Sequence, residues 1–199
     1  MPAMLRHAIF LAALWSTQAL AGPFGLEMGT SSAALKKQLT FVNPDDKFGI
    51  YRTKSMPSGH PDMETYQLLA PPTTGLCKIT ALSKKWTTSI YGSELIERFD
   101  ALEKALSAKY GQPADEFDFL RAGSMWKEDD EWMMGLLKKE RILTTFWNSK
   151  KQALPDNIGS ISLEAQAAST SQGWIILSYE FTNIDACMDS IDQSKNSSL

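Results

Sequence analysis

The residues best suited to nucleophilic chemistry lie together in one short segment, PSGHPD at 57–62. Ser58, His60 and Asp62 are the three residue types of a hydrolytic triad. A working triad is brought together by the fold from distant parts of the chain, whereas this histidine lies in a loop flanked by prolines. We therefore interpret His60 as an exposed loop histidine and not as a catalytic base.

The sequence offers few ligands for a metal ion or cofactor. After residue 21 it contains one histidine and two cysteines, too few for a four-coordinate zinc site if the cysteines are oxidised. The segment NPDDKFG at 43–49 lacks the alternating oxygen ligands of a calcium loop, and there is no phosphate-binding glycine loop or nucleophile elbow. We therefore expect no metal and no cofactor.

Carboxylates are the remaining route to catalysis, because two of them in a cleft can perform general acid–base chemistry. The obvious runs, Asp45-Asp46 and Glu128–Glu131, are expected in solvated turns or at helix starts. A non-enzymatic binding module is therefore the first hypothesis, and an envelope hydrolase with a carboxylate pair is the alternative. A cleft with two acids, one with a raised pKa, would favour the enzyme; an aromatic surface without buried acid would favour the binder.

Aromatic and methionine side chains are the best candidates for a binding surface. Trp86 has lysine neighbours in SKKWTTS, which suggests a position at the rim of an interface. The segment SMWKEDDEWMMGLLKKER at 124–141 predicts a helix over 127–139, with acids in its first turn and lysines in its last. Its apolar stripe is expected to be buried, which leaves Trp126 and Met134 as candidate contacts. Trp147 and Trp174 belong to strand patterns and are predicted to lie in the core.

The elements that must position these residues indicate an α+β fold with an antiparallel sheet of about six strands. A helix is predicted over 93–110, with Ser93 as N-cap and apolar residues at helical spacing on one face. A short helix after Thr30 and a C-terminal helix around Cys187 are also expected, and the two halves of the chain can be interpreted as related by duplication. The predicted strands are 48–54, 63–70, 75–83, 141–148, 158–167 and 173–181.

The first 21 residues have the layout of a secretory signal peptide. A basic start at Arg6 precedes an apolar run and the small-x-small sequence Ala19-Leu20-Ala21, so we expect cleavage after Ala21 and a periplasmic protein without membrane insertion. Cleavage lowers the count of basic residues from 20 to 19, against 23 acidic residues, and this acidity argues against a nucleic-acid partner. Residues 22–193 are expected to form one domain, followed by a frayed tail at 194–199.

Cys77 and Cys187 are both in the exported part of the chain. Two thiols of one small domain in an oxidising compartment are expected to form a disulfide. That bond would hold the C-terminal helix against the first group of strands.

Three segments carry a resemblance to known proteins: FGLEMGTSSAALKKQL, GLCKITA leading into LEKALSAKYGQP, and SYEFTNIDAC. Together they resemble uncharacterised exported proteins of Gram-negative bacteria. The local order of helix and strands is similar to modules of the beta-lactamase inhibitor protein and of small outer-membrane assembly lipoproteins, although the lipidated cysteine of the latter is missing. The resemblance implies a binding or inhibitory module that recognises a protein or envelope component, and it implies no catalytic residue.

Overall fold

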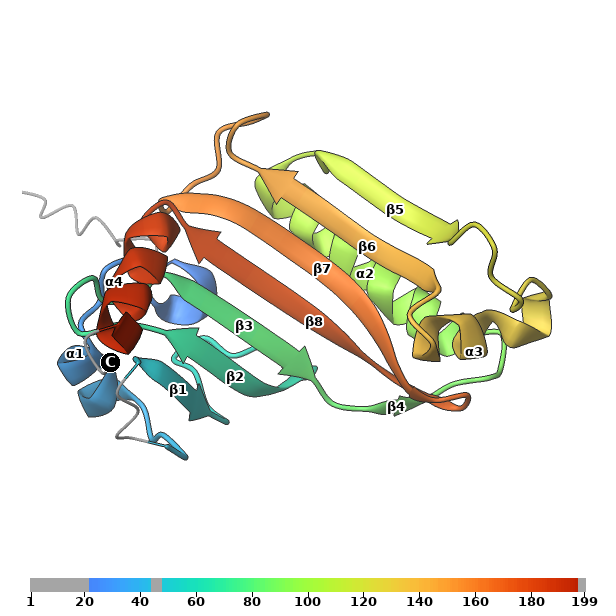
Figure 1. Cartoon of the computed structure of the whole chain (residues 1–199), viewed down its shortest axis with the longest axis horizontal. Coiled ribbons are helices and arrows are strands. Elements are labelled where there is room, and N and C mark those ends of the chain that lie inside the picture. The colour runs from blue at the N-terminus through green and yellow to red at the C-terminus, as the bar shows by residue number, and fades with distance from the viewer. Residues whose placement is uncertain (1–21, 44–47, 197–199) are drawn as a thin grey trace, which may run out of the picture.

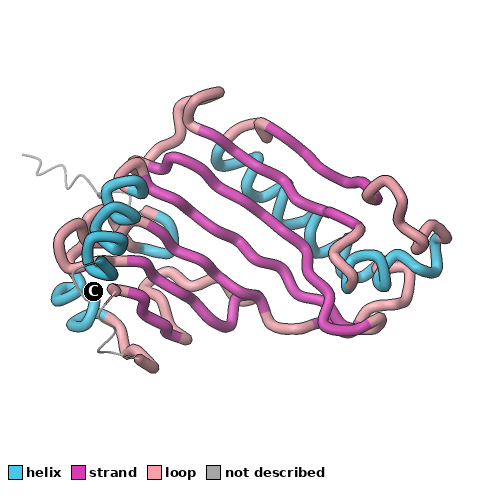
Figure 2. Tube along the Cα trace, viewed as in Figure 1, coloured by secondary structure: helices cyan, strands magenta, loops and turns pink. Residues whose placement is uncertain are grey.

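A computed structural model of the protein describes residues 22–43 and 48–196 (Figure 1). The predicted signal peptide and the Asp45-Asp46 pair lie outside these residues. The described part contains one eight-stranded antiparallel sheet together with helices, so the predicted α+β fold is confirmed. Figure 2 shows the strands running side by side as one continuous, twisted layer.

The sheet joins two strand meanders edge to edge. Its order is β1-β2-β3-β8-β7-β6-β5, and a short β4 pairs with the beginning of β8. The long hairpin of β7 and β8 lies in the middle, where alternating apolar residues produce one buried side. The strands are β1 Ile50–Thr53, β2 Met63–Leu69, β3 Lys78–Ser83, β4 Trp86–Thr87, β5 Asp115–Leu120, β6 Arg141–Asn148, β7 Ile158–Ser169 and β8 Gln172–Phe181.

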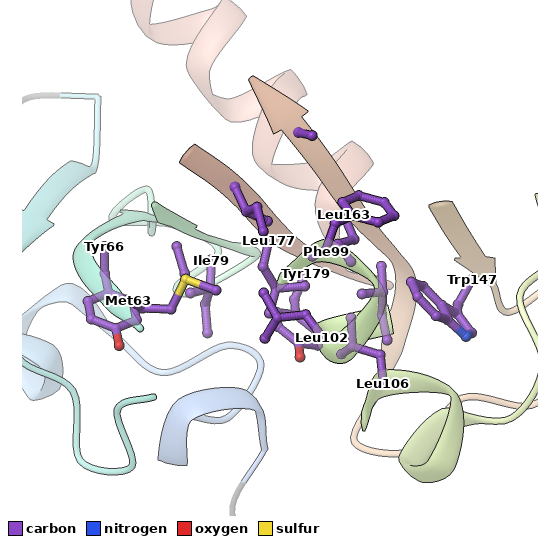
Figure 3. Packing of buried hydrophobic residues seen from close by; sticks show 14 of the residues in the cluster. Met63, Tyr66, Ile79, Phe99, Leu102, Leu106, Trp147, Leu163, Leu177 and Tyr179 are labelled. Atoms are coloured by element: carbon purple, nitrogen blue, oxygen red, sulfur yellow. The ribbon is translucent and has the colours of Figure 1, made fainter. Parts of the chain in front are cut away.

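Helix α2, Ser93–Tyr110, provides the main cover of one sheet face. Its apolar residues recur every three or four positions and pack on the inward residues of β7 and β8 (Figure 3). Trp147 of β6 is fully buried in this core, as predicted, and its indole N–H donates to the Gly111 carbonyl at 2.9 Å. The buried residues of α2 are Leu95, Phe99, Leu102, Leu106 and Tyr110.

The remaining helices lie near the two ends of the sheet (Figure 1). The short helix after Thr30 is α1, Ser32–Gln38, and the Ser31 hydroxyl accepts from the Ala34 N–H at its start. Helix α4, Ile184–Asn196, contacts the face opposite α2 above β1–β3. The other helical segments are η1 Pro23–Gly25, η2 Asp129–Glu131 and α3 Trp132–Leu137.

Several predicted boundaries change in the structure. The N-cap of α2 is Gly92 rather than Ser93, because the chain enters this helix with a positive φ of 75°. The predicted helix 127–139 is shorter and divided into η2 and α3. Helix α4 continues to Asn196 and so includes the first three residues of the tail for which we expect fraying. Strands β4 and β5 were not predicted.

The sulfurs of Cys77 and Cys187 lie at disulfide-bonding distance, as predicted. Cys77 directly precedes β3 and Cys187 lies on the buried side of α4, with the two Cα atoms 6.5 Å apart. The pair therefore connects α4 to the β1–β3 end of the sheet.

Candidate functional site

The sheet face opposite α2 is largely uncovered by the described elements. Helix α4 crosses it only at β1–β3, where Met188 and Ile191 face Leu69 and Thr80 across a cavity of about 340 Å³. Figure 1 shows no helix in front of β5, β6, β7 and most of β8. We call this surface the open face.

Three phenylalanines form an aromatic patch at the outer end of the open face. Phe117 and Phe119 of β5 alternate with acidic residues, and Phe146 comes from the neighbouring β6. Phe117, Phe119 and Phe146 are 41%, 45% and 36% exposed. The centroid of the Phe117 ring lies 6.3 Å from that of Phe119 and 6.0 Å from that of Phe146. Edge-to-face rings at these distances stabilise one another, yet more than a third of each residue stays in contact with water.

The centre of the open face is more polar than the patch. The Ser178 hydroxyl donates to the Thr80 hydroxyl at 3.3 Å, and Glu164 contacts the side-chain amide of Gln166. Trp174 also lies on this face and is half-buried, so its predicted core position is wrong. Its indole nitrogen is buried and has no hydrogen-bond partner among the described residues.

Trp86 is not at a rim, in contrast to the prediction. Its side chain is 7% exposed, and β4 holds it against Gly173 of β8. The Arg98 guanidinium of α2 lies over the ring, 4.8 Å from its centroid. The lysines next to Trp86 in the sequence indicate only its local surroundings. The burial of Trp86 is determined by packing against α2 and β8, which the local sequence does not reveal.

Trp126 and Met134 are both half-buried, and neither lies on the open-face strands. In the same segment Met125 is 73% exposed and is the more accessible side chain. The buried stripe of α3 contains Trp132, Met133 and Leu136, as predicted. The structure therefore does not bring Trp86, Trp126 and Met134 together in one surface with the aromatic patch.

His60 is an exposed loop residue, as predicted. Its Nδ1 accepts from the Asp62 N–H at 3.2 Å, and the Asp62 carboxylate pairs with Lys84 at 3.2 Å. A cavity of about 390 Å³ separates His60 and Asp62 from Glu94 and Arg98 on α2. These contacts are those of an ordinary loop, with no nucleophile bonded to the imidazole among the described residues.

An acidic cluster lies between α2 and the outer strand β5. It consists of Asp100 and Glu103 on α2 and Glu116 and Asp118 on β5. Desolvation raises the pKa of Glu103, an effect opposed by a 3.1 Å hydrogen bond from the Thr145 hydroxyl and reinforced by repulsion from Glu116 and Asp100. Desolvation and repulsion from Asp118 raise the pKa of Asp100. Negative charge is therefore concentrated at this edge.

Only part of this charge is neutralised. Arg141 lies 3.4 Å from Asp118, and Lys151 lies 2.8 Å from Asp115 at the start of β5. In the part of the chain that the structure describes, Asp100, Glu103 and Glu116 form no ion pair. Such an edge attracts basic groups.

The acidic run 128–131, one of the two predicted carboxylate candidates, has a structural role. The Glu128 side chain accepts from the Glu131 N–H, while the Glu131 side chain accepts from the Glu128 N–H at 3.2 Å. This reciprocal arrangement is a capping box at the start of η2. Across the described ranges, no group of three or more potential ligands could hold a metal ion, and no helix is both long and apolar enough to cross a membrane.

Comparison with known proteins finds no matching family model, no matching curated protein and no matching solved structure. The resemblances proposed from the sequence stay predictions.

The aromatic patch and the acidic cluster were missed in the sequence because both depend on β5. The segment DEFDFL at 115–120 alternates acids with phenylalanines, which is the period of a strand with two different faces. That alternation could have revealed the strand, although acidic residues are depleted in strands.

Proposed function

We propose that this protein is an exported, periplasmic, non-enzymatic module that binds another protein of the cell envelope through its open face. The observation that carries the proposal is the aromatic patch of Phe117, Phe119 and Phe146 on the part of the sheet face that α4 leaves uncovered. Aromatic side chains that stay in water on a rigid sheet are typical of protein interfaces.

The sheet itself supports this proposal. The patch residues stand on paired strands and contact one another, so a partner would meet a surface that is already ordered. Binding to an ordered surface costs less conformational entropy than binding to a loop. The half-buried Glu164 and Gln166 at the polar centre of the open face would supply polar contacts beside the apolar patch.

Site-specific photo-crosslinking tests the proposal. A photoreactive phenylalanine analogue replaces Phe119 in the exported protein, and a second variant carries it at Tyr91, which is 52% exposed in the turn before α2. We expect a discrete adduct from position 119 and none from position 91. Phe117→Ser should reduce adduct formation from position 119, and circular dichroism should show that this variant keeps its fold.

Two results would overturn the proposal. One is an equal yield and pattern of adducts from positions 119 and 91. The other is an adduct at position 119 that Phe117→Ser leaves unchanged, because that result would show contact without recognition of the aromatic patch.

The second candidate is an envelope hydrolase, and the acidic cluster is the observation that favours it. Asp100 and Glu103 lie one helical turn apart, and both have raised pKa values, as a general acid would. However, neither residue lines the cavities around α2 or under α4 that a substrate could enter. Hydrolysis of an envelope polymer that Glu103→Gln abolishes would favour this candidate over the binding module.

A further inference from the structure

The outer edge of β5 is the end of the sheet that has no neighbouring strand among the described residues. At the opposite end, the chain before β1 already occupies the edge. There the Val42 N–H donates to the Arg52 carbonyl, and the Asn43 side chain bonds to Ile50 and Arg52. Only the β5 edge is therefore accessible along its whole length within the described chain.

The direction of the outward backbone groups follows from the pairing of β5 with β6. The Arg121 N–H donates to the Glu140 carbonyl at 2.7 Å, so position 121 faces β6. Backbone groups alternate in an antiparallel ladder, and Phe119 and Phe117 therefore also pair with β6. Glu116, Asp118 and Leu120 direct their N–H and C=O groups outward, where another strand could bind them.

The two sides of β5 favour different side chains on an added strand. Phe117 and Phe119 extend the open face and would lie beside apolar residues. Glu116 and Asp118 lie on the α2 side, next to Asp100 and Glu103. Residues of the added strand opposite these two acids would lie within reach of four carboxylates. Of these four, only Asp118 forms an ion pair among the described residues, with Arg141.

A second copy of the chain fits this edge poorly. Antiparallel pairing of β5 with itself about Phe117 would place Glu116 opposite Asp118 of the second copy, twice. Pairing about Asp118 would place that residue opposite its own counterpart. Like charges in directly opposite positions are destabilising, so these two central registers, which pair most of β5, disfavour a dimer.

We propose that the β5 edge binds an extended segment of a partner protein in which lysine or arginine alternates with apolar residues. The segment adds an antiparallel strand to the sheet, with its apolar side chains against Phe117 and Phe119 and its basic side chains beside Glu116 and Asp118. This inference rests on the proposed binding function and adds the binding mode and the chemistry of the partner.

The test uses a short synthetic peptide in which lysine alternates with valine, titrated into the full exported protein by calorimetry. We expect binding that weakens with added salt, and no binding of a peptide with glutamate in place of lysine. Glu116→Gln combined with Asp118→Asn should weaken binding about fivefold, because two cross-strand ion pairs are lost. Asp129→Asn with Asp130→Asn is the control, since it removes the same charge from an exposed site outside the sheet.

A second pair of variants tests strand addition separately from charge. Asp118→Asn and Asp118→Pro lose the same charge, but only the proline also removes the outward N–H of an edge strand. We expect Asp118→Pro to bind the peptide at least about tenfold more weakly than Asp118→Asn. Circular dichroism and thermal unfolding of both variants report whether the fold is retained.

Equal affinity of the proline and asparagine variants for the peptide would overturn the inference, as would equal affinity for the lysine and glutamate peptides. If Phe117-dependent crosslinking at position 119 persists while the peptide does not bind, the inference fails and the proposed function stands. If that crosslinking fails as well, both fail. Self-association of the unmodified protein through β5 would also contradict the inference.

Discussion

Glu103 lies in an environment that opposes its charge. It is half-buried between α2 and β6, and Glu116 and Asp100 are close enough to repel it. The Thr145 hydroxyl is the group that stabilises its carboxylate. Several acids around one half-buried carboxylate lower the stability of the fold. Such a cost is expected where a basic partner would supply the positive charge that neutralises them.

This environment predicts that Glu103→Gln stabilises the protein at neutral pH. An acid with a raised pKa binds protons more tightly in the folded state, so its contribution to stability falls as pH rises from the ordinary value of 4.5 through the raised folded-state pKa. Glutamine keeps an oxygen for the Thr145 hydroxyl and removes the charge. We expect a gain of at most about 0.5 kcal/mol at pH 7, since solvent screens a group this exposed.

The measurement is thermal unfolding of both proteins between pH 3 and pH 8. The gain should shrink as pH falls and disappear near pH 3, where Glu103 is protonated in both states. Glu97→Gln, at an exposed position of the same helix, is the control. A gain that is independent of pH would contradict the electrostatic explanation.

At the scale of single elements, the connection between β4 and α2 has a tight backbone requirement next to the core. Gly92 has a φ of 75°, and a Cβ at this position would overlap the ring of Trp132 on α3. Gly123 also has a positive φ, 85°, but a Cβ there would meet nothing within 4 Å. Substituting each glycine by alanine therefore distinguishes the effect of backbone strain, present at both positions, from the effect of steric overlap, present only at Gly92.

We predict that Gly123→Ala lowers the free energy of unfolding by about 1 kcal/mol, through backbone strain alone. Gly92→Ala should lower it by about 3 kcal/mol, because Trp132 must also move. Urea unfolding followed by tryptophan fluorescence measures both values. Equal losses would show that the Trp132 contact does not constrain the turn.

The elements differ in how far they could be predicted from the sequence. Strand β6 begins and ends as predicted, and α2 follows its apolar spacing, since both have one clearly apolar side. Strand β5 was missed because its side chains are almost all exposed and its pairing with β6 is a tertiary contact. The aromatic patch could not be inferred without β5, and the burial of Trp86 depends on tertiary contacts with Arg98 of α2 and Gly173 of β8.

At the scale of the whole molecule, the Cys77–Cys187 pair connects the first meander to the last helix across a sequence separation of 110 residues. A cross-link that closes so long a loop restricts the unfolded chain. We predict that replacing both cysteines by alanine lowers the free energy of unfolding by about 4 kcal/mol. Urea unfolding with and without reductant measures this, and the double variant should be insensitive to reductant.

Mass spectrometry of the non-reduced protein provides the direct check, with a linked peptide containing both cysteines as the expected product. Two free thiols in that protein would contradict the prediction. A loss of stability below about 1 kcal/mol would show instead that the bond forms but adds little to the restriction of the unfolded chain.

The charge on the β5 edge also predicts the behaviour of the molecule in concentrated solution. A free edge strand beside an exposed aromatic patch would ordinarily promote pairing between copies. Glu116 and Asp118 oppose it, because they face like charges when β5 pairs with itself about Phe117 or about Asp118. We therefore expect the protein to stay monomeric and Glu116→Thr with Asp118→Thr to associate as its concentration rises, because threonine favours strands and carries no charge. Sedimentation velocity over a hundredfold range of concentration measures this, with Asp129→Thr and Asp130→Thr as the control of equal net charge. A variant that stays monomeric like the control would show that the acids on β5 are not what keeps this edge free.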